Sequence, residues 1–418
     1  MQAEIIAIGD ELLIGQTINS NAAWLGKNLN QIGIRVFRSV VIGDEKAEIL
    51  NMLDEASSRS DVIIITGGLG PTKDDITKHT LCEYFQSDLI INEEALARIT
   101  GFFQERGLPM LEMNRQQAAL PSKCTVIQNT RGTACGMWFE KDGKVFISMP
   151  GVPFEMYGMM EDEVLEMLAK RFERPDILHR TIMTIGVGES FLADKIASWE
   201  NSLAELNIKL AYLPSPGQVK LRMSCYSGDK LVNLAAIKRK ESELLEIIGE
   251  YVYAYDDDAL NIVVGRLLRQ TGTTVAVAES CTGGVIANLL TAEPGSSDFF
   301  EGGLVTYSER LKQQVLKVPA ALIKEKNVVS TEVAEVMALG AKAYFGTDYA
   351  LATTGIAGPG GGTEEIPVGT ICIALATPNG TVSKRYKFVR RRDLNIEMAC
   401  NTALNMLRKE ILKEIGGS

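Results

Sequence analysis

Short apolar runs alternate with longer segments of helical periodicity through residues 1–170. Apolar runs bounded by turn residues are typical of buried strands, whereas apolar residues at i, i+3 and i+4 are typical of helices that cover a sheet. The predicted strands are residues 4–8, 34–41 and 61–66, with a β region between 125 and 148, and the predicted helices are residues 19–32, 46–58, 93–105 and 153–171. Because strands that alternate with helices form parallel sheets, this pattern predicts an α/β layer fold with active groups at the strand carboxyl ends.

The rest of the chain divides into a short mixed segment and a second α/β region. Strands are expected in the mixed segment at 181–185, 208–213 and 219–225, and helices at 189–199 and 230–248. Residues 273–278 then alternate β-branched and small residues, and past Ser280 apolar residues recur at helical spacing. The predicted fold class is α/β, with two three-layer domains (residues 1–170 and 256–418) joined by a small α+β domain (residues 171–255).

Ser280 is predicted to lie at a strand-to-helix turn, where backbone N–H groups can hold an oxyanion. The chain has two histidines, His79 and His179, and neither lies in this half, which disfavours a Ser-His-Asp triad. Tyr307 and Lys312 lie at another predicted strand-to-helix junction, in VTYSERLK. They suggest a lysine held neutral by burial, with or without a tyrosine as proton relay. The alternative is structural: the serine caps its helix, the tyrosine packs and the lysine is solvated.

The first domain offers a glycine-rich turn with acidic residues nearby. Gly67 and Gly68, in TGGLGPT, let the backbone approach a phosphate. Carboxylates at strand ends suit a hard divalent cation that bridges phosphate oxygens, and the candidate metal ligands are Asp10, Glu11, Asp74 and Asp75. The alternative is a glycine turn followed by ordinary acidic capping of a helix.

Composition narrows the partners and the compartment. The net charge of −10 argues against nucleic acid or an anionic membrane surface. Seven cysteines without a C-x-x-C motif fit a reducing cytoplasm and no structural zinc. Cys281 is a rival nucleophile to Ser280, although a small buried residue is the simpler interpretation. The N-terminus, MQAEIIAIGDE, lacks the features of a signal peptide, so we expect a soluble cytoplasmic protein.

Motifs in the last domain resemble the nicotinamide-nucleotide amidase (PncC-type) domain. They are AESCTGG, PGSS, the GG-V-YS-K run, and TGIAGP with PVGT. The resemblance implies hydrolysis of nicotinamide mononucleotide to nicotinate mononucleotide and ammonia, with no metal or other cofactor. It also implies that Ser280 is the nucleophile and that Tyr307 and Lys312 activate it. The substrate-binding candidates that it implies are Ser297, Thr354 and Arg392.

Two departures from that family pattern lie close to these motifs. Ile366 stands where the family usually has lysine in KPVGT, and Arg390 and Arg391 stand where it usually has Gly-Asp. Either change can alter phosphate binding, but neither removes the serine, the tyrosine or the lysine.

Long motifs in residues 1–170 resemble the N-terminal domain of the CinA (competence/damage-inducible) family, which is similar to the molybdopterin-binding fold of MogA and MoaB. They are IGDELLIGQTINSNAAWL, TGGLGPTKDDIT, NRQQAALP, NTRGTACG and MPGVPFEM. The resemblance implies cleavage of ADP-ribose to AMP and ribose 5-phosphate with a divalent metal such as Mg, Mn or Co. Asn114, Gln117 and Glu155 are the implied pocket residues. Cys135 stands where the family usually has proline.

The whole chain thus resembles full-length CinA proteins, with a KH-like domain in the middle. RNA binding is not expected there, because GVGES lacks the G-x-x-G clamp and residues 171–255 hold 11 basic and 11 acidic residues. A spacer or dimer contact is preferred, and a homodimer is expected. Two alternatives remain open: the first domain is a molybdopterin-binding module, since a fold does not fix a function, or the chain is a scaffold for competence proteins.

Overall fold

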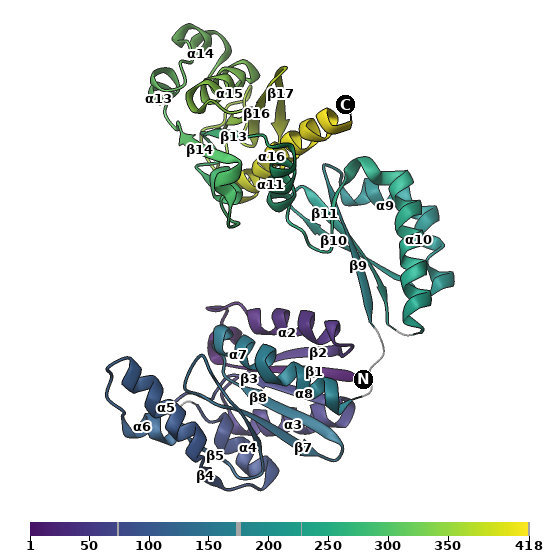
Figure 1. Cartoon of the computed structure of the whole chain (residues 1–418), viewed down its shortest axis with the longest axis vertical. Coiled ribbons are helices and arrows are strands. Elements are labelled where there is room, and N and C mark those ends of the chain that lie inside the picture. Colours follow the sequence, from purple (N-terminus) through teal and green to yellow (C-terminus); the bar gives the residue numbers. More distant parts are fainter. Residues whose placement is uncertain (73–74, 173–176, 227, 417–418) are drawn as a thin grey trace. The chain divides into compact units, whose positions relative to one another are not determined.

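The computed structural model describes residues 1–72, 75–172, 177–226 and 228–416, so the candidate ligand Asp74 lies outside the described residues. The chain divides into two units (Figure 1). One comprises residues 1–178 with 226–232, and the other comprises residues 179–225 with 233–418. Each unit is described by itself.

The first unit is built on a mixed six-stranded sheet with the order β2-β1-β3-β8-β7-β6. Its strands are β1 (Gln2–Ile8), β2 (Arg35–Ile42), β3 (Val62–Thr66), β6 (Thr125–Ile127), β7 (Gly136–Lys141) and β8 (Lys144–Met149), with a separate pair β4 (Leu89–Ile91) and β5 (Ala119–Pro121). Its helices are α1 (Asp10–Leu13), α2 (Ser20–Gln31), α3 (Lys46–Arg59), α4 (Thr77–Phe85), α5 (Glu93–Glu105), α6 (Glu112–Gln116), α7 (Pro153–Met159) and α8 (Leu165–Arg171). The parallel arrangement that the sequence predicts is confirmed for β1, β2, β3 and β8, whereas β7 and β6 pair antiparallel.

Helices cover both faces of this sheet (Figure 1). Alternate residues of a strand point to opposite faces, so Ile6 and Ile8 of β1 join the core under α3, α4 and α5, and Ile5 joins the core under α2, α7 and α8. The predicted helix 153–171 is interrupted, because a π-helical turn, Met160–Val164, separates α7 from α8. The three-layer arrangement follows from these two buried faces.

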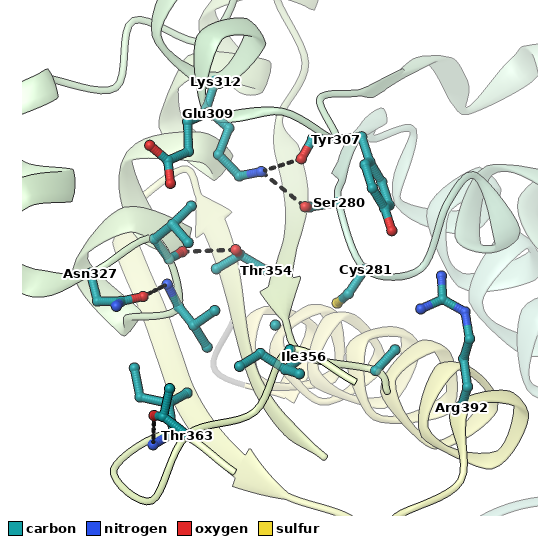
Figure 2. Close-up of a pocket in the computed structure, with 16 residues that line it drawn as sticks. Ser280, Cys281, Tyr307, Glu309, Lys312, Asn327, Thr354, Ile356, Thr363 and Arg392 are labelled. Atoms are coloured by element: carbon teal, nitrogen blue, oxygen red, sulfur yellow. Dashed lines mark hydrogen bonds between the residues drawn. The ribbon is translucent and has the colours of Figure 1, made fainter. Parts of the chain in front are cut away.

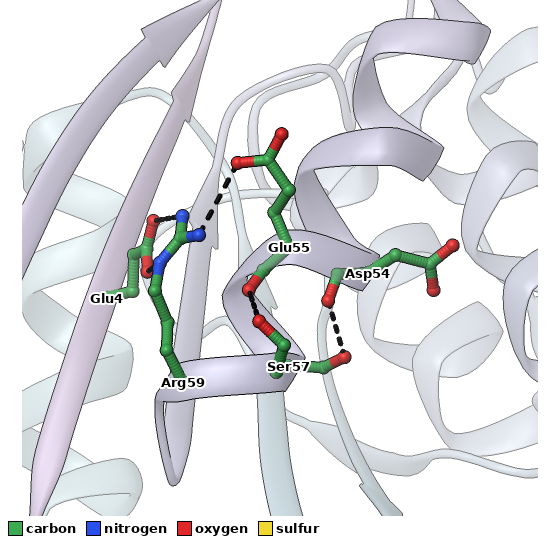
Figure 3. Close-up of polar contacts among 6 residues, drawn as sticks. Glu4, Asp54, Glu55, Ser57 and Arg59 are labelled. Carbon is green, nitrogen blue, oxygen red and sulfur yellow. Dashed lines mark hydrogen bonds and ion pairs between the residues drawn. The ribbon is translucent and has the colours of Figure 1, made fainter.

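A buried ion pair ties β1 to α3. Glu4 is fully buried, and Arg59 donates to it through Nε at 2.9 Å and Nη2 at 2.8 Å (Figure 3). Arg59 also contacts Glu55, one helical turn earlier. The hydrogen bonds to Glu4 raise the pKa of the Arg59 guanidinium, so this buried carboxylate has a fixed counter-charge.

The second unit begins with a small α+β domain. Its sheet has the order β10-β11-β9-β12. The elements are β9 (Leu178–Ile185), α9 (Glu189–Asn201), the 3₁₀ turn Ala204–Leu206, β10 (Lys209–Ser215), β11 (Gln218–Cys225), α10 (Lys230–Ile248), the 3₁₀ turn Gly249–Tyr251 and β12 (Val252–Tyr255). Every strand and helix expected between 181 and 248 is present, and β12 is an addition that the pattern did not predict.

The last domain is a second three-layer structure on a five-stranded sheet with the order β14-β13-β15-β16-β17. Its strands are β13 (Val275–Glu279), β14 (Phe300–Val305), β15 (Tyr349–Gly355), β16 (Thr370–Thr377) and β17 (Gly380–Lys387). Its helices are α11 (Leu260–Thr271), α12 (Val285–Leu290), the 3₁₀ turn Ser296–Asp298, α13 (Glu309–Gln314), α14 (Ala320–Lys326), α15 (Thr331–Phe345) and α16 (Arg392–Gly416). Val277 of β13 faces the core beside α11 and α16, whereas Ala278 faces the core beside α14 and α15. In the described part of the chain, no helix combines the length and the apolar character needed to cross a membrane.

Candidate active sites

Ser280 follows the last residue of β13, at the carboxyl end of a central strand. Its side chain is 7% exposed, and its backbone N–H donates to the carbonyl oxygen of Thr353 at 3.1 Å. The turn that follows passes through Gly283 and Gly284, whose φ angles of 64° and 100° favour glycine, and α12 begins only at Val285. The predicted strand-to-helix turn is confirmed, but the helix starts later than expected.

Lys312 reaches Ser280 from α13 and is only 1% exposed (Figure 2). Its Nζ lies 2.9 Å from Ser280 Oγ, 2.8 Å from the carbonyl oxygen of Thr306 and 3.3 Å from that of Tyr307. Among the described residues, no carboxylate pairs with it. Burial lowers the pKa of Lys312, while the nearby Cys281 and Glu309 act in the opposite direction. The solvated lysine of the structural alternative is therefore wrong.

The three partners of Nζ can be satisfied by a neutral amine as well as by an ammonium. Two of them are carbonyl oxygens, which only accept, and the third is the Ser280 hydroxyl, which can donate. A neutral amine has two N–H groups for the carbonyls and one lone pair for the Ser280 proton. The arrangement can therefore take a proton from the serine without any histidine.

The first-turn amides of α12 are already occupied. Glu279 is buried, and its carboxylate accepts hydrogen bonds from the backbone N–H groups of Gly284, Ile286 and Ala287 at 3.0, 3.2 and 2.8 Å. These three N–H groups are therefore not available to hold an oxyanion, as the helix start was expected to do. Glu279 fixes the turn that carries Ser280, and sequence reasoning missed it although it precedes the serine directly in AESCTGG.

The Tyr307 hydroxyl does not lie where a proton relay to Lys312 would require it. Its ring is 61% exposed, and in the described part of the chain its phenolic hydroxyl makes no hydrogen bond. Its backbone carbonyl, rather than its hydroxyl, contacts Lys312. Figure 2 shows the ring pointing away from Lys312, along the side of the pocket toward Arg392. The structure thus brings Ser280 and Lys312 together and leaves the phenol free.

A cavity of about 420 Å³ opens in front of these residues. Thr354 and Arg392 line it, as the resemblance implies, although the Thr354 hydroxyl already donates to the carbonyl oxygen of Val328 at 2.8 Å. Arg392 Nη1 donates to the carbonyl oxygen of Gly358 at 3.0 Å, and within the described residues its other nitrogens have no partner and can bind an anion. Ser297 lies exposed in a 3₁₀ turn and is not among the lining residues.

The residues that depart from the family pattern lie at different places relative to the cavity. Ile366 lines the cavity, where it adds apolar surface instead of a charge. Arg391 is paired with Asp393 outside the cavity. Cys281 is 5% exposed, and burial raises the pKa of its thiol to about 12, which disfavours a thiolate nucleophile.

A second cavity, of about 500 Å³, lies in the first unit. Six of the candidate residues line it: Glu11, Gly67, Gly68, Asp75, Gln117 and Glu155. The two glycines are required by close packing, because a Cβ on Gly67 would lie 2.1 Å from the carbonyl oxygen of Ile8 and one on Gly68 would lie 2.0 Å from Thr77 Oγ1. The glycine turn therefore keeps the cavity floor made of backbone.

The acidic candidates around this cavity are not equivalent. Both oxygens of Asp75 accept hydrogen bonds from its own loop, from Gly70 N at 2.8 Å and from Thr72 N and Oγ1 at 2.9 and 2.5 Å. Asp10 and Asn114 do not line the cavity, and Asn114 Oδ1 accepts from the backbone N–H of Leu111 at 3.2 Å. Asp75 thus stabilises its own loop and does not cap α4, and Asn114 stabilises the first turn of α6.

Two polar side chains at the cavity are buried or partly buried with few hydrogen-bond partners, which makes them candidates for contact with a ligand. Burial raises the pKa of Glu155, although Asn129 Nδ2 donates to its carboxylate at 2.5 Å and Arg98 is nearby. Gln117 is 5% exposed, and its Oε1 has no hydrogen-bond partner in the part of the chain that the structure describes. Asp44 also lines the cavity and accepts from the backbone N–H of Asp10, and sequence reasoning missed it.

The described residues fit a divalent cation only with help from a substrate. Glu11, Asp44 and Asp75 line the cavity with the oxygen donors that hard cations prefer. Over the described ranges, no three His, Cys, Asp or Glu side chains converge into a ligand set. This donor set suits a cation held by one or two carboxylates and otherwise by phosphate oxygens and water.

Three family models together match nearly the whole chain. Residues 4–170 match the model described as "Probable molybdopterin binding domain", residues 179–254 match "Damage-inducible protein CinA KH domain", and residues 257–411 match "CinA C-terminal domain". Their order is the order of the three domains in the structure.

Similar proteins span the same length. A CinA-like protein from Flavobacterium psychrophilum is 47% identical over 415 residues, which cover 99% of each chain. A CinA-like protein from Cytophaga hutchinsonii is 46% identical over 414 residues, covering 99% of this chain and 98% of the relative. A crystal structure of a competence-damaged protein (CinA) superfamily protein from Klebsiella pneumoniae is 31% identical and covers 37% of this chain and 96% of its own, with a TM-score of 0.36.

Proposed function

This chain belongs to the CinA family, and we propose that its C-terminal domain hydrolyses the carboxamide of nicotinamide mononucleotide, releasing nicotinate mononucleotide and ammonia. The observation that carries the proposal is the buried Lys312, whose Nζ lies 2.9 Å from Ser280 Oγ and has two carbonyl oxygens as its other partners. A serine and a neutral lysine are sufficient for amide hydrolysis through an acyl-enzyme.

In the first half of the reaction, Lys312 takes the proton of the Ser280 hydroxyl while Oγ attacks the carboxamide carbon. The resulting tetrahedral intermediate carries a negative oxygen. Its collapse breaks the C–N bond, and the Lys312 ammonium returns the proton to the departing nitrogen, so ammonia leaves and the acyl group stays on Ser280. Burial keeps Lys312 neutral before the reaction, so the amine is ready to accept the Ser280 proton, and it favours return of the proton from the ammonium when the C–N bond breaks.

In the second half, water attacks the acyl-enzyme. Lys312 accepts a proton from the water as it adds to the carbonyl carbon, and then returns it to Ser280 Oγ as the ester bond breaks. The product is a carboxylate. Arg392, at the edge of the cavity, is the residue proposed to bind the phosphate of the substrate, because its free guanidinium nitrogens can contact phosphate oxygens.

The direct test is ammonia release from nicotinamide mononucleotide by the purified full chain, with identification of nicotinate mononucleotide by chromatography. Ser280→Ala serves as the inactive control. Release of ammonia by the unaltered chain alone is the expected result. No release by the unaltered chain, or equal release by both, would contradict the proposal.

We propose a second activity for the N-terminal domain: hydrolysis of ADP-ribose to AMP and ribose 5-phosphate. Support comes from the cavity floor at Gly67 and Gly68, which is open to a diphosphate, and from the carboxylates on its wall. Glu11 and Asp44, which line the cavity, are the residues that would hold a divalent cation together with the phosphates, while Asp75 holds the loop beside them. A bound cation would neutralise charge on the diphosphate, and Glu155, with its raised pKa, lies where it can exchange a proton with a reacting group.

This second activity is tested by AMP formation from ADP-ribose with Mg²⁺, Mn²⁺ or Co²⁺, each with and without EDTA. AMP formation that EDTA abolishes is expected, while ammonia release from nicotinamide mononucleotide continues in EDTA. Tight binding of a pterin without any AMP formation would instead favour the molybdopterin-binding alternative.

A further inference from the structure

We propose that Tyr307 binds the positively charged pyridinium ring of the substrate against its aromatic face, and that it selects N-substituted pyridinium carboxamides over uncharged ones. The inference rests on the proposed deamidation at Ser280 and replaces the role of Tyr307 as a proton relay. It concerns which carboxamides the site accepts, rather than how the amide bond breaks.

The first support is an aromatic ring that is exposed on a fixed backbone. The Tyr307 ring is 61% exposed, yet the residue lines the cavity that contains Ser280. The backbone beside it is anchored: the Thr306 N–H donates to the carbonyl oxygen of Glu279 at 2.8 Å, and both Thr306 and Tyr307 accept from Lys312 through their carbonyl oxygens. An exposed ring on an anchored backbone is a ready-made contact surface for a ligand.

The second support is the position of the phenolic hydroxyl. It has no hydrogen-bond partner in the described part of the chain, and Figure 2 shows it directed toward the Arg392 side of the cavity and away from the Lys312 amine. Lys312 meets Ser280 directly at 2.9 Å, so the proton needs no relay between them. The ring face, rather than the hydroxyl, is therefore the part of Tyr307 that can serve the reaction.

The third support is the distribution of charge in the cavity. Figure 2 places Glu309 and Arg392 on opposite sides of Ser280, with Tyr307 on the Arg392 side. A phosphate is repelled by Glu309 and attracted by Arg392, so it should lie at the Arg392 end. With the carboxamide at Ser280 and the phosphate at Arg392, the ring between them lies beside Tyr307.

A pyridinium ring carries a full positive charge, and cations bind to the face of an aromatic ring within about 6 Å of its centroid. A neutral ring of the same shape gains only the van der Waals contact with Tyr307 and lacks the cation–π attraction. The site should therefore prefer a quaternary pyridinium by about 3- to 30-fold in affinity, the range of a cation–π contact. Phenylalanine retains this interaction, whereas leucine retains only the apolar surface.

The experiment measures binding separately from turnover, in the full chain with Ser280→Ala to prevent reaction. Calorimetry gives the affinities for nicotinamide mononucleotide and for its reduced 1,4-dihydropyridine form, which has the same phosphate and carboxamide but an uncharged ring. We expect Ser280→Ala to prefer the pyridinium form, Tyr307→Phe in that background to keep the preference, and Tyr307→Leu to bring the ratio close to one. Tyr344→Leu is the matched control, because Tyr344 is 62% exposed on α15 and does not line the cavity.

The kinetic arm uses the same substitutions with Ser280 intact. Tyr307→Phe should retain kcat, and Tyr307→Leu should raise the KM for nicotinamide mononucleotide by about 3- to 30-fold. A Tyr307→Phe enzyme without turnover would restore the relay role and overturn the inference, as would a Tyr307→Leu variant that still prefers the charged ring. If the unaltered chain releases no ammonia, the proposed function fails, and the binding ratios then decide the Tyr307 inference alone.

Discussion

The two cavities of this chain lie at the same place in their folds, yet the side chains predicted to act in them have different contacts. Each opens at the carboxyl ends of parallel strands, at β13 and β15 in one unit and at β1 and β3 in the other. In the first cavity, Ser280 and Lys312 contact each other and Lys312 has no counter-charge in the described residues. In the second, Asp75 is fully engaged with its own loop.

A charged motif residue near a strand end can therefore either contact a reactive group or stabilise the surrounding loop. A buried charge normally has a partner, as Glu4 has in Arg59. Lys312 has neutral acceptors and a hydroxyl instead, an arrangement that favours the uncharged amine and costs stability when the amine is protonated. Asp75 is only partly buried, and its carboxylate accepts hydrogen bonds that stabilise the loop beside the cavity.

The largest effect is expected from Ser280→Ala. Removing the nucleophile should lower kcat for deamidation by about 10⁴- to 10⁶-fold, because burial raises the thiol pKa of Cys281, the other candidate nucleophile in the cavity. Ammonia release under saturating substrate is the measurement. Cleavage of ADP-ribose serves as the internal control and should be unchanged; residual deamidation within about tenfold of the unaltered chain would move the nucleophile elsewhere, to Cys281 first.

Asp75→Asn should affect both folding and activity in the first unit. The carboxylate accepts three hydrogen bonds, so its loss should cost about 1–3 kcal/mol of unfolding free energy and distort the glycine loop. AMP formation should fall strongly. Denaturant unfolding with AMP assays at matched folded fraction separates the two effects. Unaltered stability would show that the hydrogen bonds of Asp75 to its loop contribute little to folding.

Glu279→Gln should lower deamidation by about 10- to 100-fold, because an amide has one oxygen to accept the three N–H groups of α12 and the turn carrying Ser280 shifts. The loss should appear in kcat more than in KM. Glu301→Gln, at an exposed position on β14, is the matched control. Equal kcat values for the two variants would rule out Glu279 as a positioning residue.

The smallest effect is a pH dependence of stability. The pKa of Lys312 is lowered in the folded chain, whereas in the unfolded chain it is about 10.4. Between these two pKa values the unfolded state binds more protons, so the folded state gains stability as pH rises through that window. Replacement by Lys312→Met should remove this gain. Unfolding free energies of both chains at several pH values between 6 and 10 measure it, and parallel curves would show that Lys312 is not depressed.

The fold class could be predicted from the sequence because many of the buried elements have a clear apolar pattern. The five-residue strand β3, for example, is fully buried and almost entirely isoleucine and valine. The pattern does not give side-chain direction, which is why the Tyr307 hydroxyl was expected beside Lys312 and the N–H groups of α12 were expected to be free. Both outcomes depend on the exact geometry of a turn: Lys312 Nζ donates to the backbone carbonyl of Tyr307, and Glu279 accepts from the backbone N–H of Ala287.

The candidate residues of the first unit show the same limit. Gly67 and Gly68 could be predicted, because a backbone approach requires glycine whatever surrounds it. The roles of Asp10, Asp75 and Asn114 could not, because a carboxylate or amide after a strand serves equally well as a ligand or as a cap. For Asp75 and Asn114 the hydrogen bonds decide, and these form only in the folded chain.

The most direct test of the central claim is the deamidation rate of Lys312→Arg compared with Lys312→Ala, measured across pH with nicotinamide mononucleotide. Arginine keeps the positive charge but does not lose its proton near neutral pH, so it cannot accept the Ser280 proton. The account predicts that both variants are inactive, and that the unaltered chain gains activity as pH rises through a pKa below the usual value for lysine. A Lys312→Arg enzyme with substantial activity would contradict the assignment of Lys312 as the general base.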